Sequence, residues 1–580
     1  MMTGIFNSVW ELKRMALRNL TRHKVKTIIT CLAITISVAI YIWMDSWLAG
    51  VAMESRRNII NYEMGAAKLQ TKLYFDKKDE TPAYENFTGW ETYARILDEA
   101  DYNAAPRYTF SGTLYSLSGS APVVINAVDP DAEARTLAYT TYIEFGRYIK
   151  KGEFGVALGA MTAEKLKTGI PTRPTAQNLE ELIAIAATDQ GEADFIRSCY
   201  QPMQSKAQFA ESQAYAEERS KGRMTLKRDI PATDIDRLWS LVDDAGLNDV
   251  RISTVIDYKA APDGIRKDKW DADLWHLLTP QEQALVGAAY EFDELTQAYL
   301  LIETDQEKLD AALAAMIRVD FSGAVRHVNQ VIDAKVVGMV NSPDPFNNYN
   351  IGYMPMDVLQ DEAGMMLEGH VTELIIRDKG LGAADMNSKK ESKASIRAAL
   401  DAGLARQELA LDESLDIFFW MDYAKDYLGA ESMDSMQTKL LSFLLFFLAL
   451  FGISNTMLLA ILERTKEIGM MRAMGMTDGQ MIFIYMMEAA FLGLLGSLLG
   501  IALGCLLNIP LVEYGFDFSE MLEQMEGDMG YRVAGNFRGA WKLSTIIGSG
   551  VAATVISSLM AFFPTRRATK TAITESLRFE

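Results

Sequence analysis

One short charged segment, residues 463–476, carries the side chains with which this chain could act on another protein. It separates two long apolar runs and combines both signs of charge with methionine and isoleucine. Such a segment can lie flat at a membrane surface and be held by a soluble partner, with its 468–474 side in a groove and its charges fixing the register. The candidate contact residues are Glu463, Arg464, Lys466, Glu467, Ile468, Gly469, Met471, Arg472 and Met474. The alternative is an ordinary charged loop between two membrane spans.

The chain shows no residue pattern for catalysis. It contains no GxxxxGK[ST] loop to hold nucleotide phosphates, no GxSxG, and no other nucleophile motif that we would assign. The four histidines, His23, His276, His327 and His370, are scattered and lack the spacing of a zinc site. We therefore expect a non-catalytic chain with no metal and no cofactor of its own.

Three methionines at four-residue spacing, Met521, Met525 and Met529, could ligate a soft metal ion. The chain has 31 methionines, however, so the apolar face of an amphipathic helix explains this spacing better. Metal transport is therefore the less favoured interpretation.

Four apolar runs are long enough to cross a bilayer. Residues 440–462 contain no charge, and as a helix they would measure about 34 Å against a hydrocarbon layer of about 30 Å. The mean hydropathy of the whole chain is only +0.01, because a large polar part dilutes these runs. We predict transmembrane helices over 27–52, 440–462, 481–507 and 543–563.

The chain begins with a basic amphipathic segment, residues 1–26, directly before the first apolar run. A cleaved signal peptide is the alternative, since Gly50, Val51 and Ala52 would make a passable cleavage site. The apolar run is longer than the roughly 7–15 residues of a signal peptide, which favours a retained membrane helix.

The distribution of charge predicts which parts lie on which side of the membrane. Residues 11–26 carry +5, 463–480 are neutral and 564–580 carry +2, so the rest must hold −27 of the total of −20. Because basic residues stay on the cytoplasmic side, both termini and the 463–480 loop belong there. We predict a cytoplasmic coupling segment at 463–480, a cytoplasmic tail at 564–580, an extracytoplasmic domain at 53–439 and an extracytoplasmic loop at 508–542.

Composition also excludes one class of partner and one source of stability. A net charge of −20 argues against nucleic acid, whose phosphates demand a basic surface. Of the three cysteines, Cys31 and Cys505 lie in apolar runs and Cys199 stands alone, so no pair is placed for an extracytoplasmic disulfide. Stability must come from packing.

Two features inside the spans allow both a structural and a functional interpretation. Gly496, Gly500 and Gly504 are spaced by four, which lets another helix approach closely, either within the chain or in a second copy. Glu488, the one acid of its span, should face protein or the cytoplasmic interface. Because it lies only one or two turns from the membrane edge, a structural pairing is favoured over a proton relay.

A group of large apolar residues lies near the outer ends of the first two spans. They could line an opening for acyl chains, but an aromatic belt at the membrane interface is the default interpretation and the favoured one. The residues of this possible cavity are Trp43, Met44, Trp47, Phe443, Phe446 and Phe447.

The last part of the sequence resembles a known family. GISNTMLLAILERTKEIGMMRAMGMTDGQM, the glycine-rich run after it and the terminal FPTRRATKTAITESLRFE are similar to the permease domain of FtsX/MacB-type ABC transporters. Within the polar part, residues 121–170 and 334–360 resemble periplasmic segments of lipoprotein-releasing permeases of the LolC/LolE kind. Motif, order and spacing all agree.

The resemblance implies an α-helical membrane protein of the inner membrane, with four transmembrane helices and a large mixed α/β extracytoplasmic domain inserted between helices 1 and 2. It implies that 463–476 docks on a separate ATPase subunit, a dimer that would bind ATP and Mg²⁺; MacB itself carries this ATPase on the same polypeptide. It further implies a second permease chain, identical or related, and a periplasmic carrier or membrane-fusion protein. The cargo it implies is a lipoprotein extracted from the bilayer.

The sequence departs from that family over 171–330, where about 160 residues separate segments that the family joins by a short stretch. We expect a mostly helical insertion with a small core of its own and short strands at 250–255 and 299–302. The positions at helical spacing are Leu179, Leu182, Ile183 and Ala186, and Leu309, Leu313 and Ile317.

Two other functions stay open at this point. One is MacB-like export of peptides or toxins through a membrane-fusion partner. The other is an FtsX-like regulator that moves no cargo and activates an envelope hydrolase through its outer domain.

Overall fold

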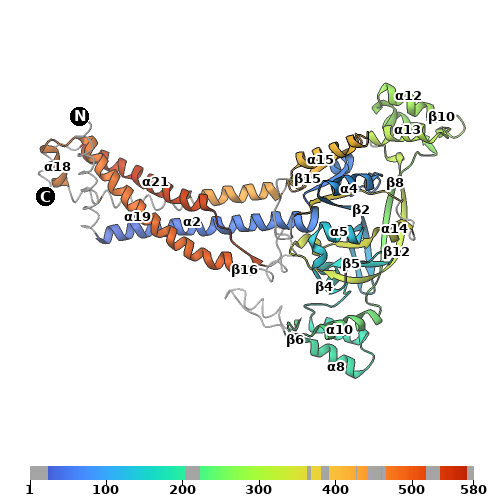
Figure 1. Cartoon of the computed structure of the whole chain (residues 1–580), viewed down its shortest axis with the longest axis horizontal. Coiled ribbons are helices and arrows are strands. Elements are labelled where there is room, and N and C mark those ends of the chain that lie inside the picture. The colour runs from blue at the N-terminus through green and yellow to red at the C-terminus, as the bar shows by residue number, and fades with distance from the viewer. Residues whose placement is uncertain are drawn as a thin grey trace. The chain divides into compact units, whose positions relative to one another are not determined.

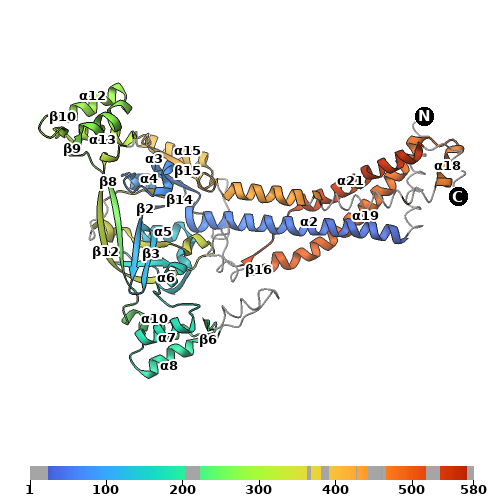
Figure 2. The same cartoon turned by 180° about the vertical axis from the view of Figure 1, so that it is seen from behind.

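The chain forms two compact units, which we describe separately. The computed structural model describes residues 24–202, 222–319, 321–361, 368–380, 391–425, 427–441, 443–444, 459, 465–517 and 536–570. The helical unit comprises Met1–Arg56 and Ala424–Glu580, and the body comprises Arg57–Tyr423. Figures 1 and 2 show the elements of each unit from two opposite sides.

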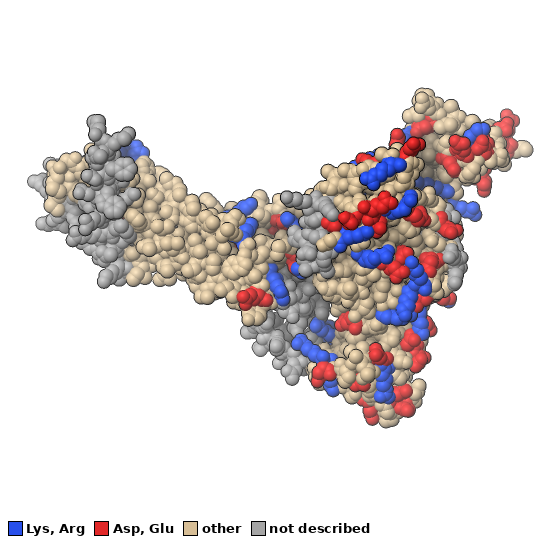
Figure 3. All heavy atoms as spheres, in the orientation of Figure 1, with Lys and Arg blue, Asp and Glu red and all other residues tan. Residues whose placement is uncertain are grey.

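The helical unit is built from long apolar helices. Among the described residues, three stretches are long and apolar enough to cross a membrane: Thr27–Met64, Asp478–Glu513 and Leu543–Arg567. The predicted span 440–462 lies almost entirely outside the described residues. In Figure 3 the described surface of α19 and α21 is almost bare of charged side chains, as lipid contact requires. The elements are α2 (Lys24–Asn58), a helical segment at 427–441, α18 (Thr465–Ala473), α19 (Asp478–Glu513), β16 (Phe516–Asp517), β17 (Asn536–Phe537) and α21 (Leu543–Thr569).

α2 is longer than its apolar run predicts. Its 35 residues correspond to about 52 Å of helix, well beyond a hydrocarbon layer of about 30 Å. The apolar run alone predicts an end at Ala52, but the charged residues Glu54, Arg56 and Arg57 continue the same helix to Asn58. The loss of hydrophobicity after Ala52 therefore does not mark the end of the helix.

α21 also extends further than predicted, through Pro564 to Thr569. Pro564 was expected to end the helix because proline has no N–H to donate. Proline removes only one backbone hydrogen bond, however. In the same turn, the Thr565 hydroxyl donates to the Ala561 carbonyl at 2.6 Å. The basic Arg566 and Arg567 consequently lie in the last turn of the helix.

The body is organised around a ten-stranded mixed sheet in which six strands close into a ring. The strand order is β15-β1-β14-β2-β3-β13-β5-β12-β4, and β8 pairs with both β2 and β12. Because β2, β3, β13, β5, β12 and β8 each pair with the next, the ring is complete. The strands are β1 (Ala67–Thr71), β2 (Tyr102–Ser116), β3 (Gly119–Val128), β4 (Ile143–Gly146), β5 (Gly155–Gly159), β8 (Asp249–Lys259), β12 (Val325–Val340), β13 (Ile351–Pro355), β14 (Glu373–Asp378) and β15 (Leu415–Phe419).

Short helical turns connect these strands. They are η1 (Ile59–Met64), α3 (Lys72–Asp76), η2 (Lys78–Glu80), α4 (Trp90–Glu99), α5 (Pro130–Thr136), η3 (Ala138–Thr141), α6 (Ala160–Lys165), η7 (Pro345–Asn348), α14 (Met356–Asp361), α15 (Lys393–Arg406) and α16 (Trp420–Tyr423). Several begin with a side-chain cap: the Asp129 carboxylate, for example, accepts the N–H groups of Asp131 and Ala132 at the start of α5. Local sequence therefore fixes where these turns start.

Side chains alternate across the ring, as the two-residue period of a strand requires. Ile252 and Ile256 of β8 are buried in the main core, together with Leu114 of β2 and Ile332 of β12. Val255, between the two isoleucines on β8, is exposed on the outside. β8 is thus one wall of the main core, although it comes from the insertion.

The insertion contributes to the body in more than one way. Its first part, which we term lobe A (171–247), packs on the main core through Leu179, Leu182 and Ile183, the helical positions that the sequence predicts. We expected the insertion to have a small core of its own. This is wrong for lobe A and for β8, which pack on the main core instead. Lobe A consists of α7 (Ala176–Ala186), α8 (Gln190–Cys199), β6 (Tyr200–Pro202), β7 (Met224–Leu226) and α10 (Ala232–Asp244).

Lobe B (260–324) is the part of the insertion that does have its own core. Trp270 stacks on Tyr299 with ring centroids 4.0 Å apart and on Trp275 at 5.4 Å. The predicted helix is present as α13, but Ala312, Ala315 and Met316 form its fully buried face instead of Leu309, Leu313 and Ile317. Small alanines face the core because they let α13 lie close to α12. The elements are β9 (Gly264–Arg266), α11 (Lys267–Lys269), η4 (Trp270–Leu274), η5 (Trp275–Leu277), α12 (Pro280–Ala289), β10 (Tyr290–Asp293), β11 (Ala298–Leu301), α13 (Gln306–Arg318) and η6 (Ser322–Ala324).

A buried charge cluster joins α5 to three strands of the sheet. Arg107 on β2 contacts the Glu133 carboxylate of α5, and its Nη1 lies 3.6 Å from Glu373 Oε1 on β14. Lys68 Nζ on β1 lies 2.8 Å from the other oxygen of Glu373. Burial alone would lower the pKa of Arg107, but Glu133 and Glu373 outweigh it and raise that pKa. Arg107 therefore keeps its charge, and loss of the carboxylates that surround it would leave a buried charge unpaired at a cost of about 3–5 kcal/mol.

If β8 is a wall of the main core, shortening an inward side chain should destabilise the protein as a core mutation does. We expect Ile252→Ala to lower the free energy of unfolding by about 2–5 kcal/mol, the usual range for a buried isoleucine. Val255→Ala on the outer side of β8 should change it by less than about 0.5 kcal/mol. Thermal unfolding of the full-length protein in detergent measures both, and equal effects would show that the insertion is independent of the ring.

Candidate functional site

The described part of the coupling segment forms a helical hairpin over residues 465–485. α18 ends in a turn in which Gly475 has a φ of +97°. The Gly475 N–H donates to the Arg472 carbonyl at 3.0 Å, and the Met476 N–H donates to the Met471 carbonyl at 3.1 Å. These two bonds make a Schellman motif, whose left-handed residue favours glycine.

α19 begins with a cap of its own. The Thr477 side chain accepts the N–H of Gln480 at 3.4 Å, and the Gln480 side chain accepts the N–H of Thr477 at 2.9 Å, which together form a capping box. Across the turn, Arg472 Nε lies 3.1 Å from Asp478 Oδ1. The angle between α18 and α19 is therefore set by bonds within the chain.

The methionines of this segment divide between two sides. Met481 and Tyr485 of α19 are buried, and Met471 and Met476 pack against them. Because Met471 and Met476 are also the residues joined by the Schellman bond, the backbone cap and the apolar contact support each other. This small core makes the hairpin one rigid piece.

The other side of the hairpin presents Met470 and Met474. Met470 is 50% exposed and Met474 is 80% exposed. The Met474 N–H donates to the Met470 carbonyl at 3.0 Å, so the two residues lie one helical turn apart on the same side. Methionine adapts its shape to a partner surface, which makes this pair suitable for contact with another protein.

The predicted contact residues are distributed accordingly. Met474 faces outward, Gly469 is buried, and Met471 and Arg472 make their described contacts within the chain. Met470 was missed, although its four-residue spacing from Met474 is a signal that could have found it. Glu463 and Arg464 lie outside the described residues, as do the side chains of Lys466, Glu467 and Ile468.

The three predicted glycines lie on the face of α19 that packs against α2. A Cβ at Gly500 would stand 2.7 Å from Val38 Cβ and 2.9 Å from the Thr35 carbonyl oxygen, both too close. Corresponding atoms of α2 lie 2.8 Å from such a Cβ at Gly496 and 3.1 Å from one at Gly504. The Thr35 hydroxyl donates to the Gly496 carbonyl at 3.1 Å, which adds a bond between the helices. The glycine face is thus used within this chain.

A second face of α19 packs against α21. A Cβ at Gly493 would lie 2.9 Å from Ser557 Cβ, and the Ser558 hydroxyl donates to the Met486 carbonyl at 3.2 Å. Glu488 lies on the same helix and is buried, as the structural interpretation of its position expects. α19 is therefore the helix through which the hairpin contacts both α2 and α21.

At the end opposite the hairpin, a short strap of residues 538–540 connects two helices of the helical unit. The Gly539 N–H donates to the Leu511 carbonyl at the end of α19 at 3.0 Å. The Ala540 N–H donates to the Ser46 carbonyl of α2 at 2.9 Å, and the Ser46 hydroxyl donates back to the Ala540 carbonyl at 2.8 Å. The strap thus ties α2 to α19 on the side opposite the hairpin.

An ion pair reinforces this junction between α2 and the start of α21. The Thr545 hydroxyl donates to Asp45 Oδ2 at 2.5 Å, and Lys542 Nζ lies 3.3 Å from the same carboxylate oxygen. The one acid in the apolar run of α2 is therefore neutralised by α21 and its flank. An unpaired charge at this depth would be expensive.

The residues of the possible acyl-chain opening are only partly described. Trp43 lies with its ring centroid 6.4 Å from that of Phe516 on β16, a contact that the sequence did not indicate. Met44 and Trp47 are half-buried and Phe443 is exposed. Phe446 and Phe447 lie outside the described residues, and so do Met521, Met525 and Met529.

A feature that sequence reasoning missed lies where α2 passes into the π-helical turn η1. Arg377 Nη1 donates to the Ile60 carbonyl at 3.0 Å, and Asn347 Nδ2 donates to the Tyr62 carbonyl at 2.7 Å. A π-helical turn changes the backbone bonding pattern, and here side chains of the body bind its carbonyl groups. We term this arrangement the η1 clamp; it carries no periodic signal in the sequence.

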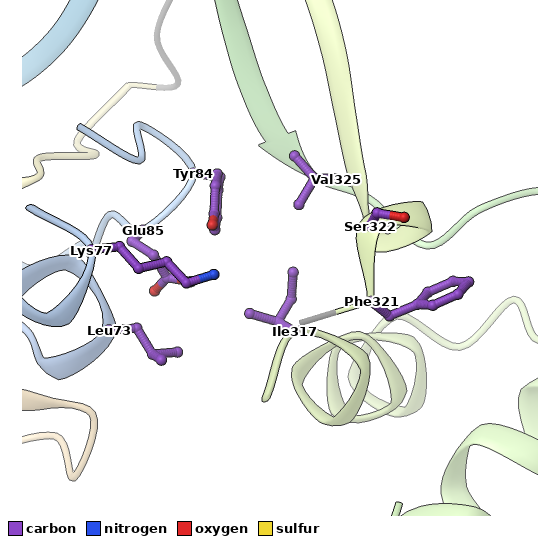
Figure 4. Close-up of a pocket in the computed structure, with 8 residues that line it drawn as sticks. All are labelled: Leu73, Lys77, Tyr84, Glu85, Ile317, Phe321, Ser322 and Val325. Carbon is purple, nitrogen blue, oxygen red and sulfur yellow. The ribbon is translucent and has the colours of Figure 1, made fainter. Parts of the chain in front are cut away.

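The body contains a small cavity between the 73–85 segment and lobe B (Figure 4). Its volume is about 30 Å³, and its walls include Leu73, Lys77 and Phe321. Glu85 also lines it, and its Oε2 is bound by Lys259 Nζ at 3.1 Å. A space of this size suits one or two water molecules and is far below the roughly 300–1,000 Å³ of a ligand pocket. Within the described ranges, no cluster of three or more His, Cys, Asp or Glu side chains could hold a metal ion.

Comparison with known proteins assigns the part of the chain that contains the hairpin. Residues 439–573 match the family described as FtsX-like permease C-terminal. An uncharacterized ABC transporter permease of Methanocaldococcus jannaschii is 35% identical over 129 residues, and the ABC transporter permease YtrF of Bacillus subtilis is 33% identical over 135 residues. A macrolide export ATP-binding/permease protein, MacB, of Psychrobacter cryohalolentis is 30% identical over 126 residues. This part of the chain is therefore similar to FtsX-like permease domains and to the permease parts of ABC transporters.

The similarity covers a limited part of each protein. Each alignment includes 22% of this chain, and it spans 29% of the first two relatives and 16% of the third. The body, lobe A and lobe B therefore lie outside these alignments.

The glycine crossing generates a direct test of the packing between α2 and α19. We expect Gly500→Ala to destabilise the helical unit by about 1–3 kcal/mol, because the new methyl group meets a Cβ and a backbone oxygen that cannot both move away. Gly548→Ala on α21 is the matched control, since nothing lies within 4 Å of the added Cβ. Thermal unfolding in detergent should show a lower Tm for the first variant only; an unchanged Tm for Gly500→Ala would contradict the close crossing.

Proposed function

We propose that this chain is the permease half of an ATP-driven ABC transporter and that its α18/α19 hairpin receives force from a separate ATPase subunit. The observation that carries this proposal is the outward pair Met470 and Met474 on a hairpin whose shape is fixed from within. The FtsX-like permease domain supports it, since permeases of this type work with an ATPase. The sequence contains no GxxxxGK[ST] loop, so we propose that ATP and Mg²⁺ bind the partner.

The hairpin is built to pass a displacement onward. A push on Met470 and Met474 reaches α19 through the small core of Met471, Met476 and Tyr485. From α19 the displacement passes to α2 through the glycine crossing and to α21 through the Gly493 contact. Tightly packed contacts transmit small shifts, because neither helix can move without the other.

α2 offers the route from the membrane to the body. It is one continuous helix to Asn58 and passes directly into η1, whose carbonyls the body binds through Arg377 and Asn347. A displacement along α2 would therefore act on β14, the strand that carries Arg377, and on η7, which carries Asn347. This supports a mechanical transmitter. The placement that we propose, with the large domain outside the inner membrane and both termini in the cytoplasm, rests on the distribution of basic residues.

The cargo that we propose is a lipoprotein, extracted from the inner membrane for a periplasmic carrier. Each buried CH₂ of an acyl chain resists transfer to water by about 0.8 kcal/mol, so extraction needs an energy source such as ATP. The resemblance of residues 121–170 and 334–360 to lipoprotein-releasing permeases supports this choice. A second candidate is export of a small molecule or peptide through a fusion protein, which the relative named for macrolide export favours.

If Met470 and Met474 contact the ATPase, charge at these positions should break the complex. We expect the double variant Met470→Glu/Met474→Glu to reduce the ATPase recovered per permease at least tenfold, because a buried unpaired carboxylate is expensive. Gly479→Glu is the control for a single added carboxylate, on the first turn of α19 where nothing lies within 4 Å of an added Cβ. Co-purification from detergent extracts measures both; undiminished recovery with the double variant would remove the coupling assignment.

A separate experiment tests the cargo. We expect depletion of the protein to retain labelled lipoproteins in the inner membrane, as measured by fractionation of the two membranes. An unchanged lipoprotein distribution combined with altered envelope hydrolase activity would instead identify a regulator that moves no cargo.

A further inference from the structure

β8 and β12 continue beyond the ring of strands as a two-stranded ribbon. After Thr254 of β8 and before Lys335 of β12, the two strands pair only with each other among the residues that the structure describes. The ribbon ends with the pair Lys259 and Val325, which are the last residue of β8 and the first residue of β12. Lobe B is the segment between these two residues.

Lobe B is therefore attached to the body through two chain crossings that lie side by side. Its first and last residues are joined by a backbone hydrogen bond, in which the Ala260 N–H donates to the Ala324 carbonyl at 3.1 Å. Because both crossings lie at one end of a narrow ribbon, changes in a few backbone angles there can turn the whole lobe.

The apolar core of lobe B does not extend into the body. Its buried residues, among them Trp270, Leu274 and Met316, all belong to the lobe. No described residue of lobe B is part of the main core, whereas lobe A packs on that core through Leu179 and Leu182 of α7. A rotation of lobe B therefore leaves both cores intact.

The wall that faces lobe B, the 73–85 segment, is fixed to the body. The Tyr108 hydroxyl of β2 donates to the Ala83 carbonyl at 3.1 Å. Just after the segment, the Phe87 N–H donates to the Val371 carbonyl at 2.9 Å. A displacement at this junction would thus move lobe B and leave the 73–85 segment in place.

The two walls of the junction do not pack closely. The cavity of about 30 Å³ separates them, and Leu73 at its edge is 39% exposed (Figure 4). Apolar side chains that face a cavity make fewer dispersion contacts than close-packed ones, so the closed junction is held weakly. The fixed wall contributes Leu73, Lys77, Tyr84 and Glu85, and lobe B with the start of β12 contributes Ile317, Phe321, Ser322 and Val325.

The carboxylate of the junction is only partly satisfied. Glu85 is 2% exposed, and its Oε2 accepts hydrogen bonds from Lys259 Nζ at 3.1 Å and from the Thr71 hydroxyl at 3.4 Å. Its Oε1 is buried and has no hydrogen-bond partner among the described residues. A buried acceptor without a partner favours a conformation in which water can reach it.

Lys259 supplies the cation for this carboxylate and lies at the end of the ribbon. The Lys259 side chain is 34% exposed, and a partly exposed ion pair contributes little to stability. The closed junction is thus held by a weak pair, and the unpaired oxygen of Glu85 acts against it.

We propose that lobe B is a hinged arm that turns about residues 259–260 and 324–325, and that the Lys259–Glu85 pair holds it closed against the 73–85 segment. When the arm turns outward, the cavity opens, water reaches Glu85 Oε1, and Leu73 and Ile317 are uncovered. The arm thereby controls access to this surface. It belongs to the insertion and goes beyond the proposed function, because its movement does not require the ATPase contact.

Distances between two spin labels, measured by double electron–electron resonance on the full-length protein in lipid nanodiscs, test the arm. Leu295→Cys labels lobe B and Leu117→Cys labels the turn between β2 and β3; these leucines are 95% and 72% exposed. The native cysteines Cys31, Cys199 and Cys505 are replaced by serine. We expect the wild-type pair to give two distances, one of them a minor population.

Lys259→Met should raise that minor population at least threefold, because the closed junction would then hold Glu85 without its cation. Adding Glu85→Leu should return the population to the wild-type level or below it, since neither a buried charge nor an unpaired acceptor remains. Arg251→Gln is the matched control and should leave the distances unchanged. It breaks an exposed ion pair on the same two strands, in which Arg251 Nε lies 2.7 Å from Asp333 Oδ1.

A single narrow distance in both the wild type and Lys259→Met would overturn the arm. An increase that Glu85→Leu does not reverse, or an equal increase with Arg251→Gln, would overturn the Lys259–Glu85 pair as the contact that holds it closed. If Lys259→Met does not fold, the wild type and the Lys259→Met/Glu85→Leu variant still decide. The second distance must then be present in the wild type and no more populated in the double variant.

Discussion

The close crossing of α2 and α19 is the constraint on which the helical unit depends. At Gly496 and Gly500 an added methyl group would lie less than 3 Å from atoms of α2, and at Gly504 it would lie 3.1 Å from Ala39 Cα, so the two backbones approach closely. In a bilayer, apolar surface alone does not hold helices together, because lipid tails are equally apolar. Close packing and the bond from Thr35 to the Gly496 carbonyl take over that role. A shift of α19 must therefore be shared by α2.

Each end of this crossing is closed by polar groups. On the hairpin side the Schellman turn, the capping box and the Arg472–Asp478 pair fix α18 on α19. On the side opposite the hairpin, the strap at 538–540 and the Asp45 ion pair fix α2 to α19 and α21. The apolar side chains that stay exposed outside these contacts lie mostly along α2, α19 and α21, where lipid would cover them. The exposed Met470–Met474 pair lies on the hairpin, and we assign it to the partner ATPase.

Much of this arrangement could be predicted from the sequence, since its signals are local. Apolar run length located three spans that the structure describes, and four-residue glycine spacing located the crossing. Periodicity located α7 with its buried leucines and also α13, where Leu313 and Ile317 pack on the lobe B core. It did not indicate that Ala312, Ala315 and Met316 form the fully buried face of α13. Ring closure by β8 and the η1 clamp depend on contacts between residues far apart in the chain. The inward direction of Met471 depends on the exact phase of a helix. No pattern along the chain specifies them.

The central claim, that the hairpin meets an ATPase on the cytoplasmic side, is tested most directly by labelling with a membrane-impermeant maleimide. Met474→Cys reports on the hairpin and Leu295→Cys on lobe B, because both side chains are exposed. We predict that Leu295→Cys reacts in spheroplasts, whereas Met474→Cys reacts only after the membrane is permeabilised and is protected when the ATPase is co-expressed. Reaction of both cysteines from the outside would contradict the account.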